Sequence, residues 1–233
     1  MVDQFRVHSC FVGIGAFGSE CIADGVEHRE ATSKMVPDED PDPADAVVDC
    51  EGSVTDDQFS EFDVVVTTGN AAVDGTVETA VRVAETCASD AVTMALVAGD
   101  QTAADLTRLE DAFGVVVPIE QKQRIRELAT DVFTLFSQPM LLRTDYGQIN
   151  ANLRDAGVLS LSRSVGTREE LPALIDDCGG PENVVLGYVE VGTEFTLRNA
   201  ETLEAQFETP EIVTGQATFD GPSKCRLTLL RRT

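Results

Sequence analysis

The opening of the chain joins an expected strand to a glycine-punctuated turn, and this order constrains the fold more than any other feature. Phe5 to Gly18 reads FRVHSCFVGIGAFG, and Ser19 to His28 is compatible with a helix. Glycines let a backbone turn tightly and approach an anion, while the amide groups and dipole of a following helix supply the positive end. The pattern predicts a phosphate cradle and makes a nucleotide the first ligand to test, with an ordinary strand-to-helix turn as the alternative. The candidate cradle residues are Gly13, Gly15, Gly18 and Ser19.

The net charge of the chain limits the classes of partner that it is expected to bind. It carries 41 acidic and 17 basic residues, a formal net charge of -24, and its lysines are Lys34, Lys122 and Lys224. Such a surface repels nucleic acid and anionic membranes at low salt. Excess carboxylate with scarce lysine is typical of cytosolic proteins of halophiles, where salt at about 1 M or above shortens the Debye length to about 3 Å. We therefore expect a halophilic protein with no nucleic-acid partner.

The cysteines indicate a reduced, intracellular protein. Six cysteines are dispersed without a CxxC pair, and His8 and His28 are the histidines, so no zinc cluster is expected. No apolar run approaches the roughly 18 to 20 residues that span a bilayer. The expected location is cytoplasmic, without direct membrane insertion.

Alternating strand and helix patterns fill the first half of the chain. The acidic, proline-rich stretch Pro37 to Asp45 is expected to be a solvated loop. Expected strands are Asp63 to Thr67, Ala91 to Ala98 and Val115 to Pro118, and expected helices are Thr76 to Ser89 and Thr102 to Phe113. This order predicts a parallel sheet covered by helices.

From Ile119 the pattern changes to a long amphipathic helix that ends near Gln138, before Pro139. Its apolar stripe is Ile125, Leu128, Ala129, Val132, Phe133 and Phe136. Further helices are expected at Gln148 to Ala156 and Arg168 to Cys178, and strands at Leu159 to Arg163, Val184 to Val191, Phe195 to Arg198, Ile212 to Phe219 and Arg226 to Arg231. The predicted division is a nucleotide-binding-like domain (1–118), a central helix (119–139) and a C-terminal α/β domain (140–233).

Three local matches resemble the FtsZ/tubulin superfamily. Asp63 to Glu85 (DVVVTTGNAAVDGTVETAVRVAE) looks like the family's hydrophobic strand, its TAGM-like turn, its GGGTGTG signature loop and the following helix. Arg143 to Gln148 (RTDYGQ) falls where the family carries an NxDxxD-type loop, and Glu211 to Arg231 is similar to its final hairpin. The chain thus resembles a divergent, shortened, haloarchaeal member of the superfamily. The resemblance implies an α/β fold with a parallel Rossmann-like nucleotide-binding sheet, a long central helix and a smaller C-terminal α/β domain.

The resemblance also implies site residues. The nucleotide-binding positions would be Gly13, Gly15, Gly18, Ser19, Gly69, Asn70, Gly75 and Thr76, for GTP or GDP, with Mg²⁺ only where a nucleotide binds. Catalytic positions would be Asp145 and Gln148, which act on the nucleotide of the next subunit, although Asp145 is also read as a helix N-terminal acid. The acid that recognises guanine corresponds to Thr130 or Asp131, so base specificity stays open. No other metal site is expected.

Departures from the family pattern determine the order in which we rank the functional hypotheses. Ala71 to Asp74 replaces GGGT, which adds side chains and a carboxylate where phosphate would meet bare backbone. Gln148 can orient water but cannot act as a general base. The first hypothesis is a cytoskeletal or cell-division-related protein with degenerate GTP-binding and catalytic loops, which acts by self-association or by binding a family filament. The alternatives are an active GTP-dependent polymerising GTPase and a Rossmann-type dinucleotide-binding protein.

Overall fold

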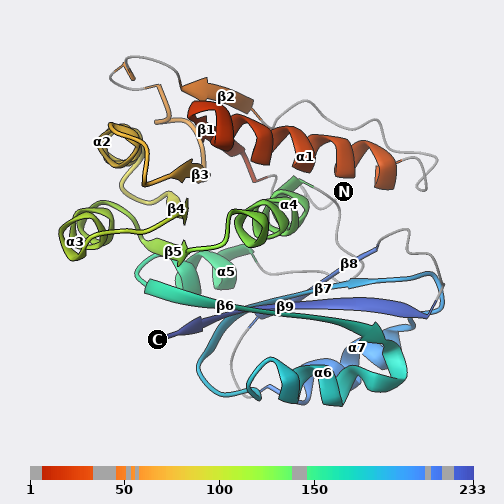
Figure 1. The fold of residues 1–233 in the computed structure, drawn as a ribbon. Helices are drawn as coiled ribbons and strands as arrows, with labels where there is room; N and C mark the ends of the chain where they lie inside the picture. Colours follow the sequence, from red (N-terminus) through yellow and green to blue (C-terminus); the bar gives the residue numbers. More distant parts are fainter. Residues whose placement is uncertain are drawn as a thin grey trace.

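The computed structural model describes residues 7–33, 46–50, 54–55, 58–137, 146–207, 211–216 and 223–233. Its strands are β1 (Ser9–Ile14), β2 (Ala46–Cys50), β3 (Val64–Asn70), β4 (Val92–Ala98), β5 (Val115–Ile119), β6 (Gly157–Thr167), β7 (Val184–Val191), β8 (Glu211–Gln216) and β9 (Lys224–Arg232). Its helices are α1 (Gly15–Ser33), α2 (Thr76–Glu85), α3 (Ala103–Ala112), α4 (Lys122–Ser137), α5 (Tyr146–Leu153), α6 (Leu171–Asp177) and α7 (Leu197–Glu204), with a 3₁₀ turn at Arg168–Glu170. Figure 1 shows their arrangement.

The described strands form one sheet in the order β2-β1-β3-β4-β5-β6-β9-β7-β8. The strands from β2 to β5 are parallel, and β1 lies between β2 and β3. Strand β2, the next strand in the chain after β1, lies on one side of β1, and β3 lies on its other side. A topological switch point therefore lies at the carboxyl ends of β1 and β3. Ligands of open parallel sheets bind at such a point. The two glycine-containing turns follow these two strands.

Strand β6 links the parallel strands to the C-terminal part. Its first residues, Gly157 and Val158, pair in parallel with Val115 and Val116 of β5. The rest of β6 pairs antiparallel with β9, which pairs antiparallel with β7, and β8 lies parallel to β7. The fold class predicted from the sequence is therefore confirmed, whereas the division at residues 118 and 139 stays a prediction.

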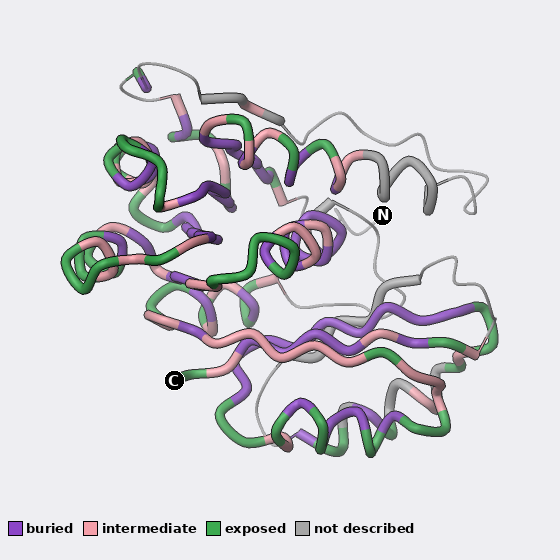
Figure 2. Tube along the Cα trace, viewed as in Figure 1, coloured by how far each residue is buried: buried purple, intermediate pink, exposed green. Residues whose placement is uncertain are grey.

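Helices cover both faces of the sheet (Figures 1 and 2). On one face of the parallel strands, α1 and α4 pack on the main core, and α2 and α3 cover the other face. The apolar side chains of α6 and α7 cover one face of the C-terminal strands, while α4 packs on the opposite face. Helix α4 is therefore enclosed by both parts of the sheet.

The predicted stripe of α4 is confirmed. Its six residues are buried or, for Phe136, partly buried in the main core. The turn from Asp131 to Leu135 is buried on every side, because sheet strands lie on both flanks. A helix in this position gains more from packing than from its intrinsic helix propensity. Ile119, however, belongs to β5, so the helix begins at Lys122 rather than at Ile119.

One prediction of secondary structure is wrong, and one strand was not predicted. The segment Phe195 to Arg198 is not a strand, because Thr196 caps α7: its hydroxyl accepts from the Asn199 amide at 3.3 Å, and Asn199 Oδ1 accepts from the Thr196 amide at 2.9 Å. Reciprocal bonds of this kind begin a helix. Strand β2 was not predicted, since its five residues directly follow the acidic stretch, which itself lies outside the described residues.

Other boundaries differ by a few residues. Helix α1 is longer than Ser19 to His28, α2 ends at Glu85 rather than Ser89, and β6 is longer than Leu159 to Arg163. Among the described helices, none has both the length and the apolar character needed to cross a membrane.

Candidate functional site

The first turn connects β1 directly to α1. Gly15 has a φ of +66°, and a Cβ built on it would have no atom within 4 Å, so this residue is open to the surroundings. The next residue, Ala16, is exposed. The first amide groups of a helix have no intrahelical acceptor, so this turn retains the geometry of an anion site at a helix N-terminus.

The other two glycines of the first turn serve close packing. A Cβ on Gly13 would lie 2.7 Å from the Ser19 amide nitrogen, and a Cβ on Gly18 would lie 2.4 Å from the Thr68 carbonyl oxygen. The Thr68 hydroxyl also donates to the Gly18 carbonyl at 3.2 Å. The Ser19 hydroxyl donates to the Gly15 carbonyl at 3.1 Å, within the helix itself. Gly13 and Gly18 thus allow α1 to lie against β1 and β3, the role of the third glycine in a dinucleotide-binding turn.

The second turn connects β3 to α2, and four of its amide groups are already bonded. The amide of Ala71 donates to the Ala98 carbonyl (2.9 Å), Ala72 to Asn70 Oδ1 (3.2 Å), Val73 to the Asn70 carbonyl (3.0 Å) and Thr76 to the Val73 carbonyl (3.2 Å). Such amides are the groups that hold phosphate in glycine-rich loops. This turn is therefore closed on itself.

Side chains also change the character of the second turn. Val73 is 53% exposed, and Asp74 and Asp100 are exposed at the same edge of the sheet. Gly75 takes a φ of +82°, and Gly69 admits the Thr76 methyl group, to which a Cβ would come within 2.7 Å. These glycines are explained by the turn and its packing, and the carboxylates disfavour a polyphosphate.

Ion pairs and a cation–π contact link helices α1 and α4 beside the first turn. Arg126 Nε donates to Asp24 Oδ2 at 2.8 Å, and its Nη1 lies 3.5 Å from Glu20 Oε2. The Lys122 ammonium lies 5.6 Å from the centre of the Phe17 ring, within cation–π range. The sequence analysis missed these residues, although the i, i+4 spacings of the acids on α1 and of the bases on α4 could have indicated them.

The described candidate catalytic residue, Gln148, belongs to the opposite edge of the sheet. Tyr146 of α5 donates its hydroxyl to the Asp63 carbonyl at 3.0 Å, and Arg154 donates to the Ser89 carbonyl at 2.6 Å. Because Asp63 immediately precedes β3 and Ser89 precedes β4, α5 lies at the amino ends of these strands. Gln148 is exposed there, and Asp145 lies outside the described residues. One chain therefore does not bring Gln148 to the glycine turns.

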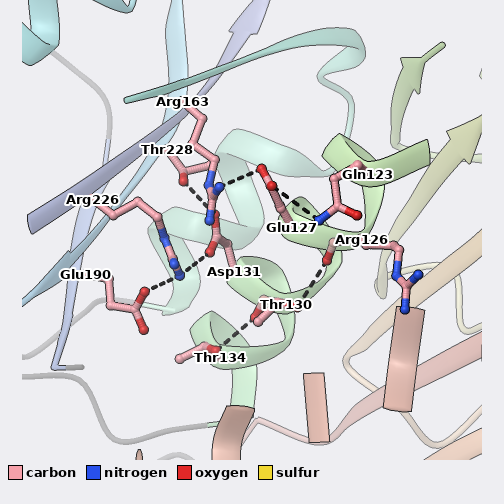
Figure 3. Close-up of polar contacts among 10 residues, drawn as sticks. All are labelled: Gln123, Arg126, Glu127, Thr130, Asp131, Thr134, Arg163, Glu190, Arg226 and Thr228. Atoms are coloured by element: carbon pink, nitrogen blue, oxygen red, sulfur yellow. Dashed lines mark hydrogen bonds and ion pairs between the residues drawn. The ribbon is translucent and has the colours of Figure 1, made fainter. Parts of the chain in front are cut away.

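Of the two positions considered for base recognition, Asp131 points toward residues of the C-terminal strands (Figure 3). Its carboxylate accepts from Arg226 Nη2 at 2.6 Å, from the Thr228 hydroxyl at 2.6 Å and from Arg163 Nε at 3.2 Å. These partners belong to β6 and β9, so the carboxylate is enclosed by the C-terminal strands and is not available to a ligand at the turns. Thr130 donates its hydroxyl to the Arg126 carbonyl at 3.0 Å.

Burial raises the pKa of two thiols, one on the helix that follows the first turn and one just after the helix that follows the second. It raises the pKa of Cys21, on α1 beneath the first turn, to about 12, against a smaller lowering by Arg126. Burial likewise raises the pKa of Cys87, after α2, to about 12. Thiols of this kind are unreactive at neutral pH. Neither is suited to nucleophilic chemistry.

Comparison with known proteins identifies the fold. No family profile and no curated protein matches the sequence. Among solved structures, the chain is similar to the empty FtsZ dimer of M. jannaschii (TM-score 0.72, 13% identity, 99% of this chain and 89% of that chain). It is also similar to the W319Y mutant of the same FtsZ (TM-score 0.69, 14% identity, 99% and 92%). A CetZ2 protofilament of Haloferax volcanii with GTPγS bound gives a TM-score of 0.60 at 11% identity, with 95% of this chain and 92% of that chain covered.

These similarities extend over nearly the whole chain and include both the parallel strands and the C-terminal part. Identities of this size establish a shared fold. The chain therefore has the fold of the FtsZ/tubulin superfamily.

Proposed function

We propose that this protein is an FtsZ/tubulin-like cytoskeletal or cell-division-related protein with degenerate GTP-binding and catalytic loops. It acts by self-association or by binding a filament of the family, in the cytoplasm of a halophilic microbe. The observation that carries the proposal is the separation of the candidate sites. The glycine turns lie at the carboxyl edge of the parallel strands, and Gln148 lies at the amino edge.

If Gln148 acts at the glycine turns, it does so at the turns of a second subunit. Two different surfaces at opposite ends of one chain meet only when copies stack head to tail, which is a heterologous contact that generates open filaments. Two of the similar structures are described as an FtsZ dimer and a CetZ2 protofilament, which supports an assembly of this kind. The partner is then a second copy of this chain or a filament of the same fold.

Nucleotide binding is proposed to be weak. Gly15 and the first amides of α1 could hold one phosphate group of GTP or GDP, with Mg²⁺ bound only through the nucleotide. The second turn offers few free donors and places Asp74 beside the same region. Hydrolysis is weak or absent for two reasons: Gln148 cannot take a proton from water, and the second turn gives little help in neutralising the γ-phosphate.

The test combines binding, turnover and assembly on one sample. GTP and GDP are titrated by calorimetry in molar KCl with Mg²⁺, phosphate release is followed at several protein concentrations, and sedimentation velocity is measured with and without nucleotide. We expect association without nucleotide, together with weak binding and little turnover. Tight binding with turnover that rises with protein concentration would instead establish the active polymerising GTPase. A monomer at all concentrations, with no binding to a family filament, would contradict the proposal.

A further inference from the structure

Figure 3 shows a buried ionic cluster between α4 and the C-terminal strands. Asp131 of α4 and Glu190 of β7 are 1% and 0% exposed, and their shared partner Arg226 of β9 contacts both carboxylates. Arg163 of β6 binds Asp131 and also Glu127, one helical turn earlier, at 2.6 Å. The cluster therefore connects α4 with three strands at once.

The surroundings of this cluster are apolar and tightly packed. Leu128, Val132 and Leu135 of α4 face Leu186, Tyr188 and Leu230 of the strands, and they leave a cavity of only about 10 Å³, room for about one water molecule. Charges in such an interior are stable only with their partners in place. Removing one partner leaves an uncompensated charge.

Apolar packing alone does not select one position of a helix on a sheet, because the hydrophobic effect is not directional. A slide of α4 by one turn, about 5.4 Å, would exchange residues four apart. In one direction Leu135 would take the place of Asp131 and would leave the Arg226 guanidinium and Glu190 against a leucine. In the other direction Glu127 would take the place of Asp131 and keep a carboxylate there, so the slide is opposed instead by Arg124, which is exposed and would enter the place of Leu128 in the core.

We infer that this cluster is a register lock, which together with the apolar stripe of α4 restricts that helix to a single position on the C-terminal strands. Asp131 is its central positioning residue, since it receives hydrogen bonds from Arg163, Arg226 and Thr228. Helix α4 begins beside the first glycine turn and runs back toward the amino ends of the strands. The lock therefore fixes the C-terminal strands relative to both edges of the parallel sheet, independently of any nucleotide.

The test measures position rather than stability. Spin labels are attached at Gln123→Cys on α4 and Lys224→Cys on β9, both exposed sites, in a background where the native cysteines that react without unfolding are replaced by serine. Distance distributions are recorded for this parent protein and for an apolar variant that combines Asp131→Leu, Glu190→Leu, Arg226→Met and Thr228→Val. Two further variants, Asp131→Asn and Glu127→Gln, complete the set.

The parent should give one narrow distance, and the folded apolar variant should add a second population displaced by about 5 Å. Asp131→Asn should broaden the distribution, whereas Glu127→Gln, the matched control at a half-buried partner of Arg163, should leave it narrow. A folded apolar variant or Asp131→Asn protein with the parent's narrow distribution would overturn the lock. Failure of both to fold would assign the cluster to stability rather than register, and would overturn it too.

Discussion

The two strand-to-helix turns at the carboxyl edge have similar glycine content but different structures. In the first turn, Gly13 and Gly18 bring α1 against the strands, and Gly15 leaves the start of the helix open. In the second turn, the backbone between Asn70 and Thr76 bonds to itself and to β4, and Val73 is exposed in place of a glycine. A glycine pattern can thus persist because two elements pack closely, with or without a ligand.

The two turns also differ in whether the fold requires their glycines. The packing glycines are required by the fold, since a Cβ at either position would meet backbone atoms. At the positions where the proposed alignment has glycines, the second turn carries Ala71 and Ala72, which fit a turn that is already bonded. A chain that is not under selection to bind polyphosphate would lose the glycines of the second turn and keep the packing glycines of the first. The two turns make this explanation testable.

The largest expected difference concerns thiol reactivity. Cys21 lies beneath the first turn with a pKa raised to about 12 by burial, so at pH 8 it should hold about a thousandfold less thiolate than a thiol of ordinary pKa. A Val73→Cys variant places a thiol at the exposed second turn. Labelling at pH 8 followed by peptide mass spectrometry should modify position 73 rapidly and Cys21 only after unfolding. Rapid labelling of Cys21 in the folded protein would show that the first turn is loosely packed.

The next effect concerns the packing glycines. Gly18→Ala should lower the free energy of unfolding by about 3 kcal/mol, because the new methyl group must displace the Thr68 carbonyl, 2.4 Å away. The matched control Gly15→Ala adds a methyl group to open space and carries only the cost of a positive φ, about 1 kcal/mol. Denaturant unfolding in molar KCl measures both. Equal losses would mean that Gly18 has no special packing role.

A smaller effect concerns the closed second turn. Asn70 is 7% exposed and accepts the Ala72 amide, so Asn70→Ala should cost about 1.5 kcal/mol by leaving that amide without its acceptor. Asp74→Ala, at an exposed position of the same turn, should change stability by less than about 0.5 kcal/mol. The same unfolding experiment compares the two. If Asn70→Ala were as harmless as the control, the turn would not depend on its internal bonds.

Much of the fold could be predicted from the sequence, and the failures have local causes. The valine-rich strands and the stripe of α4 are visible as short-range patterns. The helix α7 was missed because its capping residues Thr196 and Asn199 lie beside Phe195, which favours a strand by itself. The ionic cluster was not predictable, since Asp131 meets partners 32 and 95 residues away, and only the folded sheet brings them together.

The candidate site was predicted less completely. The sequence indicated the glycine turns, yet the pattern alone does not distinguish a glycine that faces a ligand from one that faces a backbone carbonyl, as Gly18 does. The location of Gln148 depends on which edge of the sheet α5 occupies, and the topology of the fold determines that edge. The assignment of Gly13, Gly15, Gly18, Ser19, Gly69, Asn70, Gly75 and Thr76 as nucleotide-binding residues, and of Asp145 and Gln148 as catalytic residues, stays a prediction.

The most direct test of the central claim is a GTP titration of two proteins in the same molar KCl buffer with Mg²⁺. One is the natural chain, and the other carries Ala71→Gly, Ala72→Gly, Val73→Gly and Asp74→Thr, which restores the family's loop. If the closed second turn limits binding, the restored protein should bind at least about tenfold more tightly, a gain of about 1.4 kcal/mol. Equal binding by both, whether tight or weak, would contradict the claim that the closed second turn limits binding.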